Sequence, residues 1–258
     1  MNLRYLLAMI ALGYFGFGLL LFLLQRSFIY MPVGNIAHDY PVKQFASGDE
    51  TIEVVVLNGG KPDAVVYFGG NAEQVVANAP GFVRSMPRHA VYLVNYRGYA
   101  GSSGEPSEQG LYADALNIHD RIRDQHQSVS VIGRSLGSGV ATYLAANRPV
   151  ERLILVTPFD SILHIAQDQY PIYPVSLMLR DRYDSRSRVG EITAQTLIVL
   201  AERDGIIPRK YSQRLIGAFP PSQVTVRMIQ DTGHNGLSAS GDYYSLLSRF
   251  LEEGSAAE

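Results

Sequence analysis

Ser135 is the only serine of this chain that stands in the pattern G-x-S-x-G, which can present a serine as a nucleophile. It lies between Gly133 and Gly137, after a β-branched run at 129–132 and before a helix-like stretch at 139–147. A strand that turns sharply into a helix holds the serine in a strained conformation with its hydroxyl exposed, and glycines leave room for that turn. Because short motifs also arise in inert turns, other residues have to supply the rest of the chemistry.

A serine hydroxyl is a weak nucleophile at neutral pH and needs a base beside it. Among the six histidines, His234 lies in a glycine-containing loop, 231–236, directly after the last predicted strand. His164 lies in an irregular segment and is the second candidate. The other four lie in a linker, at the amino-terminal end of a strand, or in or after a helix: His38, His89, His119 and His126. We assign the base to His234, because glycines let a loop histidine approach another element closely.

A histidine base needs a carboxylate that fixes its tautomer and stabilises the imidazolium. Asp204 follows a predicted strand and is our choice for this acid. Glu202 and Asp160 are the competitors, since each also follows a strand. With Asp204 the chain order is Ser135, Asp204, His234, which is the order of an α/β-hydrolase triad.

Acyl transfer also needs two preorganised N–H donors for the oxyanion, each worth ~10²–10³ in rate. One donor is expected from Leu136, the residue after the nucleophile. The other is expected from the turn Gly69-Gly70-Asn71, which follows an early strand, and we favour the Asn71 amide. The alternative for this segment is a tight turn without a chemical role.

The elements that must position these residues alternate between strands and helices after residue 60. Apolar runs predict strands at 52–57, 64–68, 90–95, 129–132, 153–156, 197–201 and 224–229. Helices are predicted at 73–86, 108–125, 139–147 and 243–251. Near-continuous apolar strands that alternate with helices are typical of an α/β fold with a mostly parallel sheet and helices on both faces. In such sheets the active site lies at the carboxyl ends of the strands.

The amino-terminal segment predicts a membrane anchor. Residues 5–24 carry no charge, and Arg4 and Arg26 bracket them. A helix of this length spans a hydrocarbon core of about 30 Å. A signal peptide has a shorter apolar core and a cleavage site, so we expect an uncleaved transmembrane helix within 1–26 and a membrane-proximal linker at 27–41. The charge bias is nearly balanced, and we favour a catalytic domain on the non-cytoplasmic side.

Four motifs carry a resemblance to a known family. They are Tyr67-Phe68-Gly69-Gly70-Asn71-Ala72, the block Asn95-Tyr96-Arg97-Gly98-Tyr99-Ala100-Gly101-Ser102-Ser103-Gly104, Gly133-Arg134-Ser135-Leu136-Gly137-Ser138 and Thr157-Pro158-Phe159-Asp160-Ser161. From about residue 26 to 250 the chain resembles the α/β-hydrolase superfamily, and more closely its membrane-anchored ABHD-type serine hydrolases. Relatives often have a histidine where this chain has Gly69, and the resemblance implies the same role for the loop in both.

The resemblance implies a hydrolase domain at 42–253 with a short lid insertion near 158–190. Tyr170, Tyr173 and Met178 of that lid are candidates to bind substrate in an apolar acyl pocket, and the alternative is that they pack on the core. An anchor beside a lightly covered site favours an acyl ester or thioester, lipid or acylated, presented at the lipid bilayer. The alternative functions are a serine peptidase of the same fold and a non-catalytic membrane-tethered scaffold.

The composition argues against several other classes of protein function. The net charge is −2 without a long run of one sign, so nucleic-acid binding is not indicated. The chain has no cysteine and therefore no disulfide framework or thiolate nucleophile. No group of His, Asp and Glu has the spacing of metal ligands, and we expect neither a metal nor a cofactor. The last residues, 254–258, are predicted to be a disordered tail.

Overall fold

The computed structural model describes residues 2–253, so the predicted disordered tail lies outside the described residues. The described part contains one eight-stranded sheet in the order β1-β2-β4-β3-β5-β6-β7-β8. The strands are β1 (Val42–Ser47), β2 (Glu50–Leu57), β3 (Asp63–Phe68), β4 (His89–Val94), β5 (Ser128–Arg134), β6 (Arg152–Val156), β7 (Gln195–Ala201) and β8 (Val224–Ile229). The pairs β1–β2 and β2–β4 are antiparallel, and every later pair in this order is parallel. This arrangement confirms the predicted α/β-hydrolase fold.

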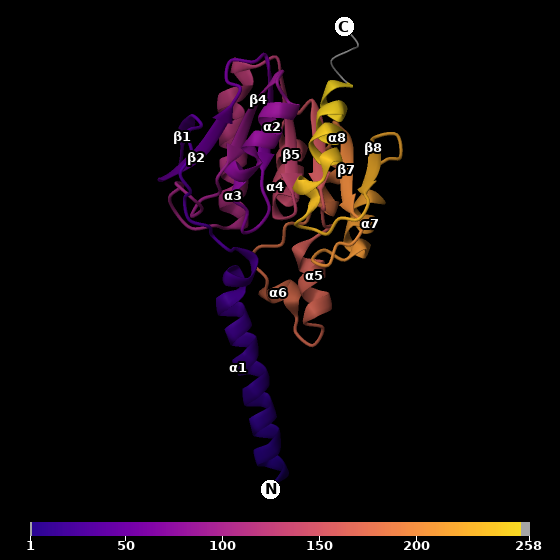
Figure 1. Cartoon of the computed structure of the whole chain (residues 1–258). Helices are drawn as coiled ribbons and strands as arrows, with labels where there is room; N and C mark the ends of the chain where they lie inside the picture. Colours follow the sequence, from indigo (N-terminus) through magenta and orange to yellow (C-terminus); the bar gives the residue numbers. More distant parts are fainter. Residues whose placement is uncertain (1, 254–258) are drawn as a thin grey trace.

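Helices cover both faces of this sheet (Figure 1). They are α1 (Leu3–Ile29), α2 (Ala79–Ser85), α3 (Glu108–Ile122), α4 (Leu136–Asn147), α5 (Ile162–Gln169), α6 (Val175–Met178), α7 (Arg209–Ile216) and α8 (Gly241–Glu252). Short 3₁₀ helices are η1 (Val75–Asn78), η2 (Arg123–Gln125), η3 (Arg186–Glu191) and η4 (Leu237–Ala239). Alternate residues of a strand point to opposite faces, and accordingly Val54 and Val56 belong to the core cluster that includes residues of α3, α4 and α7, whereas Val55 and Leu57 belong to the cluster that includes residues of α2 and α8.

The strand register brings the predicted site residues to one edge of the sheet. Phe68 at the end of β3 lies opposite Gly133 of β5, and Arg134 lies opposite Val156 of β6. Further along, Ala201 of β7 lies opposite Ile229 of β8. Because these strands are parallel, the loops that follow them leave the sheet side by side.

Helix α1 projects away from the sheet domain, and the short helices α5 and α6 lie beside its domain-proximal part (Figure 1). Only Gly18 and Gln25 of α1 are buried. Its 27 residues span about 40 Å at 1.5 Å per residue, and it is the one helix within residues 2–253 that is long and apolar enough to cross a membrane. It continues beyond the predicted boundary at residue 26 and ends at Ile29, where the Tyr30 N–H still donates to the Arg26 carbonyl at 2.8 Å.

Three parts of the structure differ from the sequence-based expectations. The predicted helix at 73–86 is divided into η1 and α2, with Pro80 at the start of α2, where a missing N–H costs nothing. The stretch at 158–190, expected to be irregular, contains α5, α6 and η3. Strand β1 and helix α7 are present where no element was expected.

Candidate active site

Ser135 lies at the sharp turn between β5 and α4. Its φ of 49° and ψ of −114° are sparsely populated by residues other than glycine, and such strain is common at functional sites. The flanking glycines permit this turn. A Cβ on Gly137 would lie 2.1 Å from the Phe68 carbonyl oxygen, and one on Gly133 would lie 2.3 Å from the Gly137 oxygen. Since the atoms in the way belong to the backbone, only glycine fits at either position.

The structure brings Ser135, His234 and Asp204 into one chain of hydrogen bonds. Nε2 of His234 lies 3.0 Å from Oγ of Ser135, and Nδ1 of the same ring lies 2.8 Å from Oδ2 of Asp204. With Nδ1–H donating to the carboxylate, Nε2 is free to accept the serine proton. This is the geometry that a serine–histidine–carboxylate triad requires.

The surroundings of Asp204 keep it ionised. Burial opposes its charge, but the hydrogen bond from His234 and the N–H groups of Ile207 and Ile206, at 2.8 and 2.9 Å, hold the pKa of Asp204 below its ordinary value. The charged carboxylate thus faces a histidine whose side chain is 7% exposed. A half-buried carboxylate next to the ring stabilises the imidazolium that forms during proton transfer.

The competing residues are occupied elsewhere. The fully buried Asp160 accepts a 2.7 Å hydrogen bond from Nδ1 of His164, so these two residues pair with each other. Glu202 accepts the N–H of Asp231 at 2.9 Å. Of the three candidate carboxylates, Asp204 is therefore the one that bonds to the His234 ring.

The predicted oxyanion turn lies directly against the serine. A Cβ on Gly70 would lie 3.6 Å from the Ser135 Cβ. Asn71 lines the same cavity as Ser135 and His234. Leu136 is the first residue of α4, and first-turn N–H groups have no acceptor within their helix. The structure therefore places both predicted donors, Asn71 and Leu136, beside the nucleophile.

Side chains from the Tyr96–Tyr99 block support this turn. The Tyr96 hydroxyl donates to the Gly69 carbonyl at 2.6 Å, and the Tyr99 hydroxyl donates to Oδ1 of Asn71 at 2.8 Å. The same Oδ1 accepts the N–H of Met31 at 2.8 Å. The end of α1 is thus tied through Met31 to the loop in front of Ser135.

Glu73 is a site residue that the sequence patterns did not single out. Its carboxylate accepts the Gly70 N–H at 2.5 Å, the Tyr67 hydroxyl at 2.6 Å and the Asn78 amide at 2.7 Å. It also lies 3.5 Å from the buried Arg134 guanidinium. Burial disfavours the charge of Arg134, but Glu73 raises the pKa of that guanidinium above its ordinary value. The sequence did contain a signal for Glu73: it is an acidic residue three positions after a Gly-Gly turn, at the start of a predicted helix.

Arg134 connects the oxyanion turn to the histidine loop, because its Nη2 donates to the His234 carbonyl at 3.1 Å. We expect Glu73→Gln to lower the free energy of unfolding by about 3 kcal/mol, since it leaves the Arg134 charge buried without its partner. We also expect kcat to fall roughly tenfold or more, because glutamine keeps one accepting oxygen and turns a donating N–H₂ group either toward the Gly70 N–H or toward Tyr67 and Asn78. Urea denaturation and ester kinetics measure the two effects.

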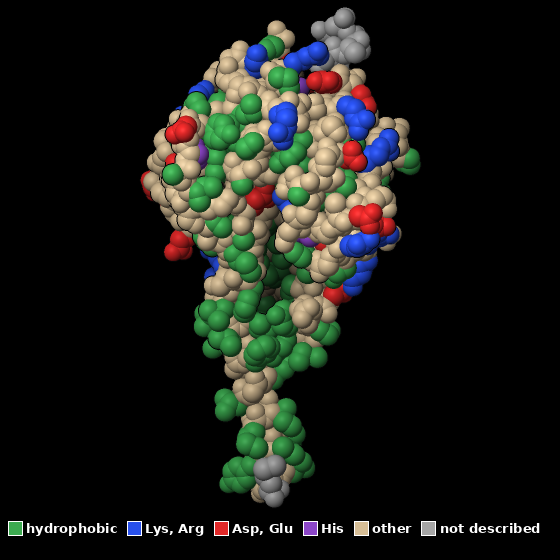
Figure 2. Space-filling model, viewed as in Figure 1, with side chains coloured by type: hydrophobic (Ala, Val, Ile, Leu, Met, Phe, Trp, Pro, Cys, Tyr) green, Lys and Arg blue, Asp and Glu red, His purple; other side chains and the backbone are tan. Residues whose placement is uncertain are grey.

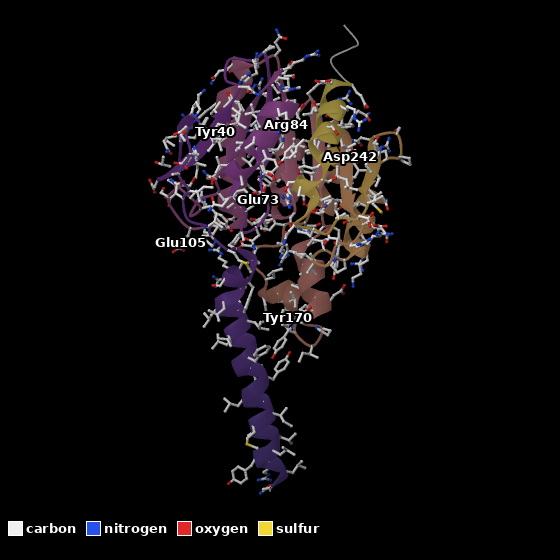
Figure 3. All side chains as sticks on the ribbon, in the orientation of Figure 1. Tyr40, Glu73, Arg84, Glu105, Tyr170 and Asp242 are labelled. Carbon is white, nitrogen blue, oxygen red and sulfur yellow. The ribbon has the colours of Figure 1, made fainter. Side chains whose placement is uncertain are left out.

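The matched control is Glu105→Gln, which makes the same change at an exposed side chain (Figure 3). Its stability should stay within about 0.5 kcal/mol of the wild type. If Glu73→Gln were as stable and as active as this control, the pair Glu73–Arg134 would not hold the site together.

A cavity of about 430 Å³ opens beside Ser135 and His234. Most of the residues that line it have polar side chains; the lining consists of Gly70, Asn71, Ala72, Glu73, Gln74, Ala77, Asn78, Arg134, Ser135, His234, Asn235 and Ser238. The predicted substrate contacts Tyr170, Tyr173 and Met178 do not line this cavity; they line an apolar groove against α1. Figure 3 labels Tyr170 on the lid, on the side of the domain from which α1 projects.

The fold and this site define an alpha/beta hydrolase. A family model described as the alpha/beta hydrolase fold matches residues 54–186, and the chain belongs to that family. The match confirms the family that the four motifs between residues 67 and 161 indicated.

Individual relatives agree with this assignment. An uncharacterized protein of Mycobacterium tuberculosis is 34% identical over 186 residues, which are 69% of this chain and 65% of that protein. The lysophosphatidylserine lipase ABHD12 of Bos taurus is 30% identical over 157 residues, 52% of this chain and 38% of the lipase. The match therefore spans less than two thirds of either relative. The solved Pyrococcus furiosus esterase Pf2001 superposes with a TM-score of 0.71 at 13% identity, covering 87% of this chain and 98% of that one.

Proposed function

We propose that this protein is a membrane-anchored serine hydrolase that cleaves carboxylic ester or thioester bonds. The observation that carries the proposal is the continuous hydrogen-bonded chain Ser135–His234–Asp204 at a strained turn between a strand and a helix. In the proposed roles Ser135 is the nucleophile, His234 the general base and acid, and Asp204 the group that orients the ring.

The reaction follows from these positions. Nε2 of His234 accepts the Ser135 proton while Oγ attacks the carbonyl carbon, and the carbonyl electron pair moves onto oxygen. The N–H groups of Leu136 and Asn71 stabilise that oxyanion. When the tetrahedral intermediate collapses, the alcohol or thiol leaves with the proton from Nε2, and Ser135 keeps the acyl group. Water then attacks the acyl carbon while Nε2 of His234 accepts its proton. Collapse of this second intermediate returns the proton to Oγ, which releases the carboxylic acid and restores the Ser135 hydroxyl.

Three features support an acyl substrate at a membrane. Helix α1 is apolar, exposed and long enough to span a bilayer. The end of this helix is tied through Met31 to Asn71 at the site, so the anchor holds the site close to the bilayer surface. One relative, the bovine ABHD12, is named a lysophosphatidylserine lipase.

A fluorophosphonate probe, which reacts only with an activated serine, tests the proposal. We expect the probe to label the full chain in membranes and the label to map to Ser135. Labelling should disappear in His234→Ala, because the base that activates the hydroxyl is removed. A folded wild type that resists the probe would favour a membrane-tethered scaffold, and preferential turnover of aminoacyl amides would favour a peptidase.

The membrane side of the domain is a separate proposal. We propose that the domain lies on the non-cytoplasmic side, from the weak charge difference between the flanks of α1. Protease added to sealed right-side-out vesicles should then digest the domain. Digestion only after the vesicles are opened would place it in the cytoplasm.

A further inference from the structure

The lid, residues 158–190, contacts α1 deep inside the predicted membrane span. The rings of Tyr14 and Tyr173 stack with centroids 4.7 Å apart. A Cβ on Gly18 would lie 2.9 Å from the Tyr173 ring, so glycine lets the lid approach the helix closely. Tyr14 precedes Arg26 by 12 residues, or about 18 Å along the helix axis. Since Arg26 marks the polar boundary of the span, this contact lies roughly at the middle of a 30 Å hydrocarbon core.

Hydrogen bonds between α1 and the lid make the lid compatible with that depth. The Tyr14 hydroxyl donates to the Ile172 carbonyl at 2.9 Å, and the Tyr173 hydroxyl donates to the Tyr14 carbonyl at 3.0 Å. Nearer the boundary, Gln25 donates to the Met178 carbonyl and accepts the Arg180 N–H. Irregular backbone is tolerated at membrane depth only where its polar groups find partners, and these bonds supply them.

The outer surface of the lid is also suited to lipid. Residues 169–179 contain no charged side chain. Ile172 is 70% exposed and Leu177 is 83% exposed, which is unfavourable in water and favourable in hydrocarbon. Figure 2 shows hydrophobic side chains gathered around the domain-proximal half of α1 and the adjoining lid, below a hollow in the surface. Charged residues appear again at the boundary, where Arg26 pairs with Asp181 at 3.0 Å.

Between α1 and the lid lies an apolar groove of about 100 Å³. Phe22 of α1 and Tyr173 and Met178 of the lid line it, and all three also line an adjoining hollow of about 300 Å³. Ile29 and Ile162 belong to the same groove. Ile29 stands two residues before Met31, which donates to Asn71 in the oxyanion turn, so this end of the groove is the end nearest the site.

We propose that α1 and the lid together form the acyl-binding groove of the enzyme, and that it opens sideways into the bilayer. A fatty acyl chain enters between them from the hydrocarbon core, and the ester carbonyl reaches Ser135. The polar alcohol part of the substrate then occupies the cavity beside Ser135 and His234. The substrate class is a long-chain acyl ester of a membrane lipid, and α1 is part of the binding site as well as the tether. The inference rests on the proposed function.

Filling the groove tests its role. Ala166 lines it, and Ala166→Phe adds a ring to that wall. We expect the ratio of kcat/KM for palmitoyl over butyryl esters, measured with the full chain in phosphatidylcholine vesicles, to fall at least tenfold. The control Leu23→Phe adds a ring on a face of α1 that is 65% exposed and outside the groove, and its ratio should match the wild type. An unchanged ratio in Ala166→Phe would contradict the acyl-binding role of the groove. A wild type that hydrolyses neither ester would instead contradict the proposed function.

A second measurement reports the depth of the lid without relying on turnover. Because the chain has no cysteine, Leu177→Cys carries a single environment-sensitive fluorophore. Lipids with nitroxide groups on their acyl chains should quench that fluorophore, and they should not quench one at Lys61→Cys, which lies on an exposed turn of the sheet domain. Equal absence of quenching at both positions would place the lid in water and contradict lateral entry.

Discussion

Ser135→Ala is expected to reduce ester turnover by about 10⁶-fold and to abolish labelling by a fluorophosphonate probe. The magnitude is that measured when a triad serine is removed from an enzyme with this chemistry. The reason lies in the geometry: among residues 2–253, Ser135 is the hydroxyl residue hydrogen-bonded to Nε2 of His234, with its Oγ at 3.0 Å, so it is the one placed to give its proton to that base. Steady-state hydrolysis of a chromogenic acyl ester by the purified full chain in vesicles measures the loss.

The control is Ser245→Ala, an exposed serine on α8 whose hydroxyl donates to the Asp242 carbonyl. Turnover and labelling should match the wild type, because this residue lies outside the site. A small residual rate in Ser135→Ala is compatible with the proposal, since oriented amides and binding alone accelerate hydrolysis over water. Turnover within tenfold of the wild type would exclude Ser135 as the nucleophile.

The sequence was sufficient to place the parallel strands and the residues that follow them. Buried parallel strands are near-continuous apolar runs, and the strand predicted at 153–156 coincides with the four buried residues of β6. Residues that follow parallel strands meet at one edge, so Ser135, Asp204 and His234 could be grouped from their positions in the sequence alone. Strand β1 was missed because it is an edge strand: most of its residues are exposed, and only Phe45 and Ser47 are buried.

Contacts between distant parts of the chain could not be predicted in the same way. Glu73 has an ordinary helix-start sequence, and its role depends on Arg134 packing against it from another element. The lid gives a stronger example. Its Tyr173 was predicted to line an apolar acyl pocket or to pack on the core, and nothing in the sequence indicated that its ring stacks on Tyr14, 159 residues earlier in the chain. An anchor has a pattern that depends only on its own residues, whereas the groove that it shares with the lid depends on how two segments pack.

Asp204→Asn is expected to lower kcat by about 10⁴-fold, the loss seen when a triad carboxylate is made neutral. An asparagine retains an oxygen for the Ile206 and Ile207 N–H groups but turns an amide N–H₂ toward Nδ1 of His234. The ring then accepts at Nδ1 and carries its proton on Nε2, so it cannot take the proton of Ser135. A pH-independent loss between pH 6 and 9, in the same ester assay, is the expected result.

The same substitution also changes how stability depends on pH. The pKa of Asp204 lies below its ordinary value of about 3.9, so the folded state binds fewer protons than the unfolded state in that range. Its contribution to stability is fully present above pH 4 or so and is lost as the pH falls through the folded pKa. The difference in free energy of unfolding between wild type and Asp204→Asn should therefore be largest near pH 7 and should shrink below about pH 4.

Asp231→Asn separates the role of Asp204 from a general effect of removing a carboxylate near the histidine loop. Asp231 is exposed and has a φ of 55°, a conformation that asparagine also adopts readily. We expect near-wild-type turnover and a stability change within about 0.5 kcal/mol. If Asp204→Asn kept turnover within tenfold of this control, another group would have to orient the ring. Asp160 could take that role only by giving up its own 2.7 Å hydrogen bond to His164.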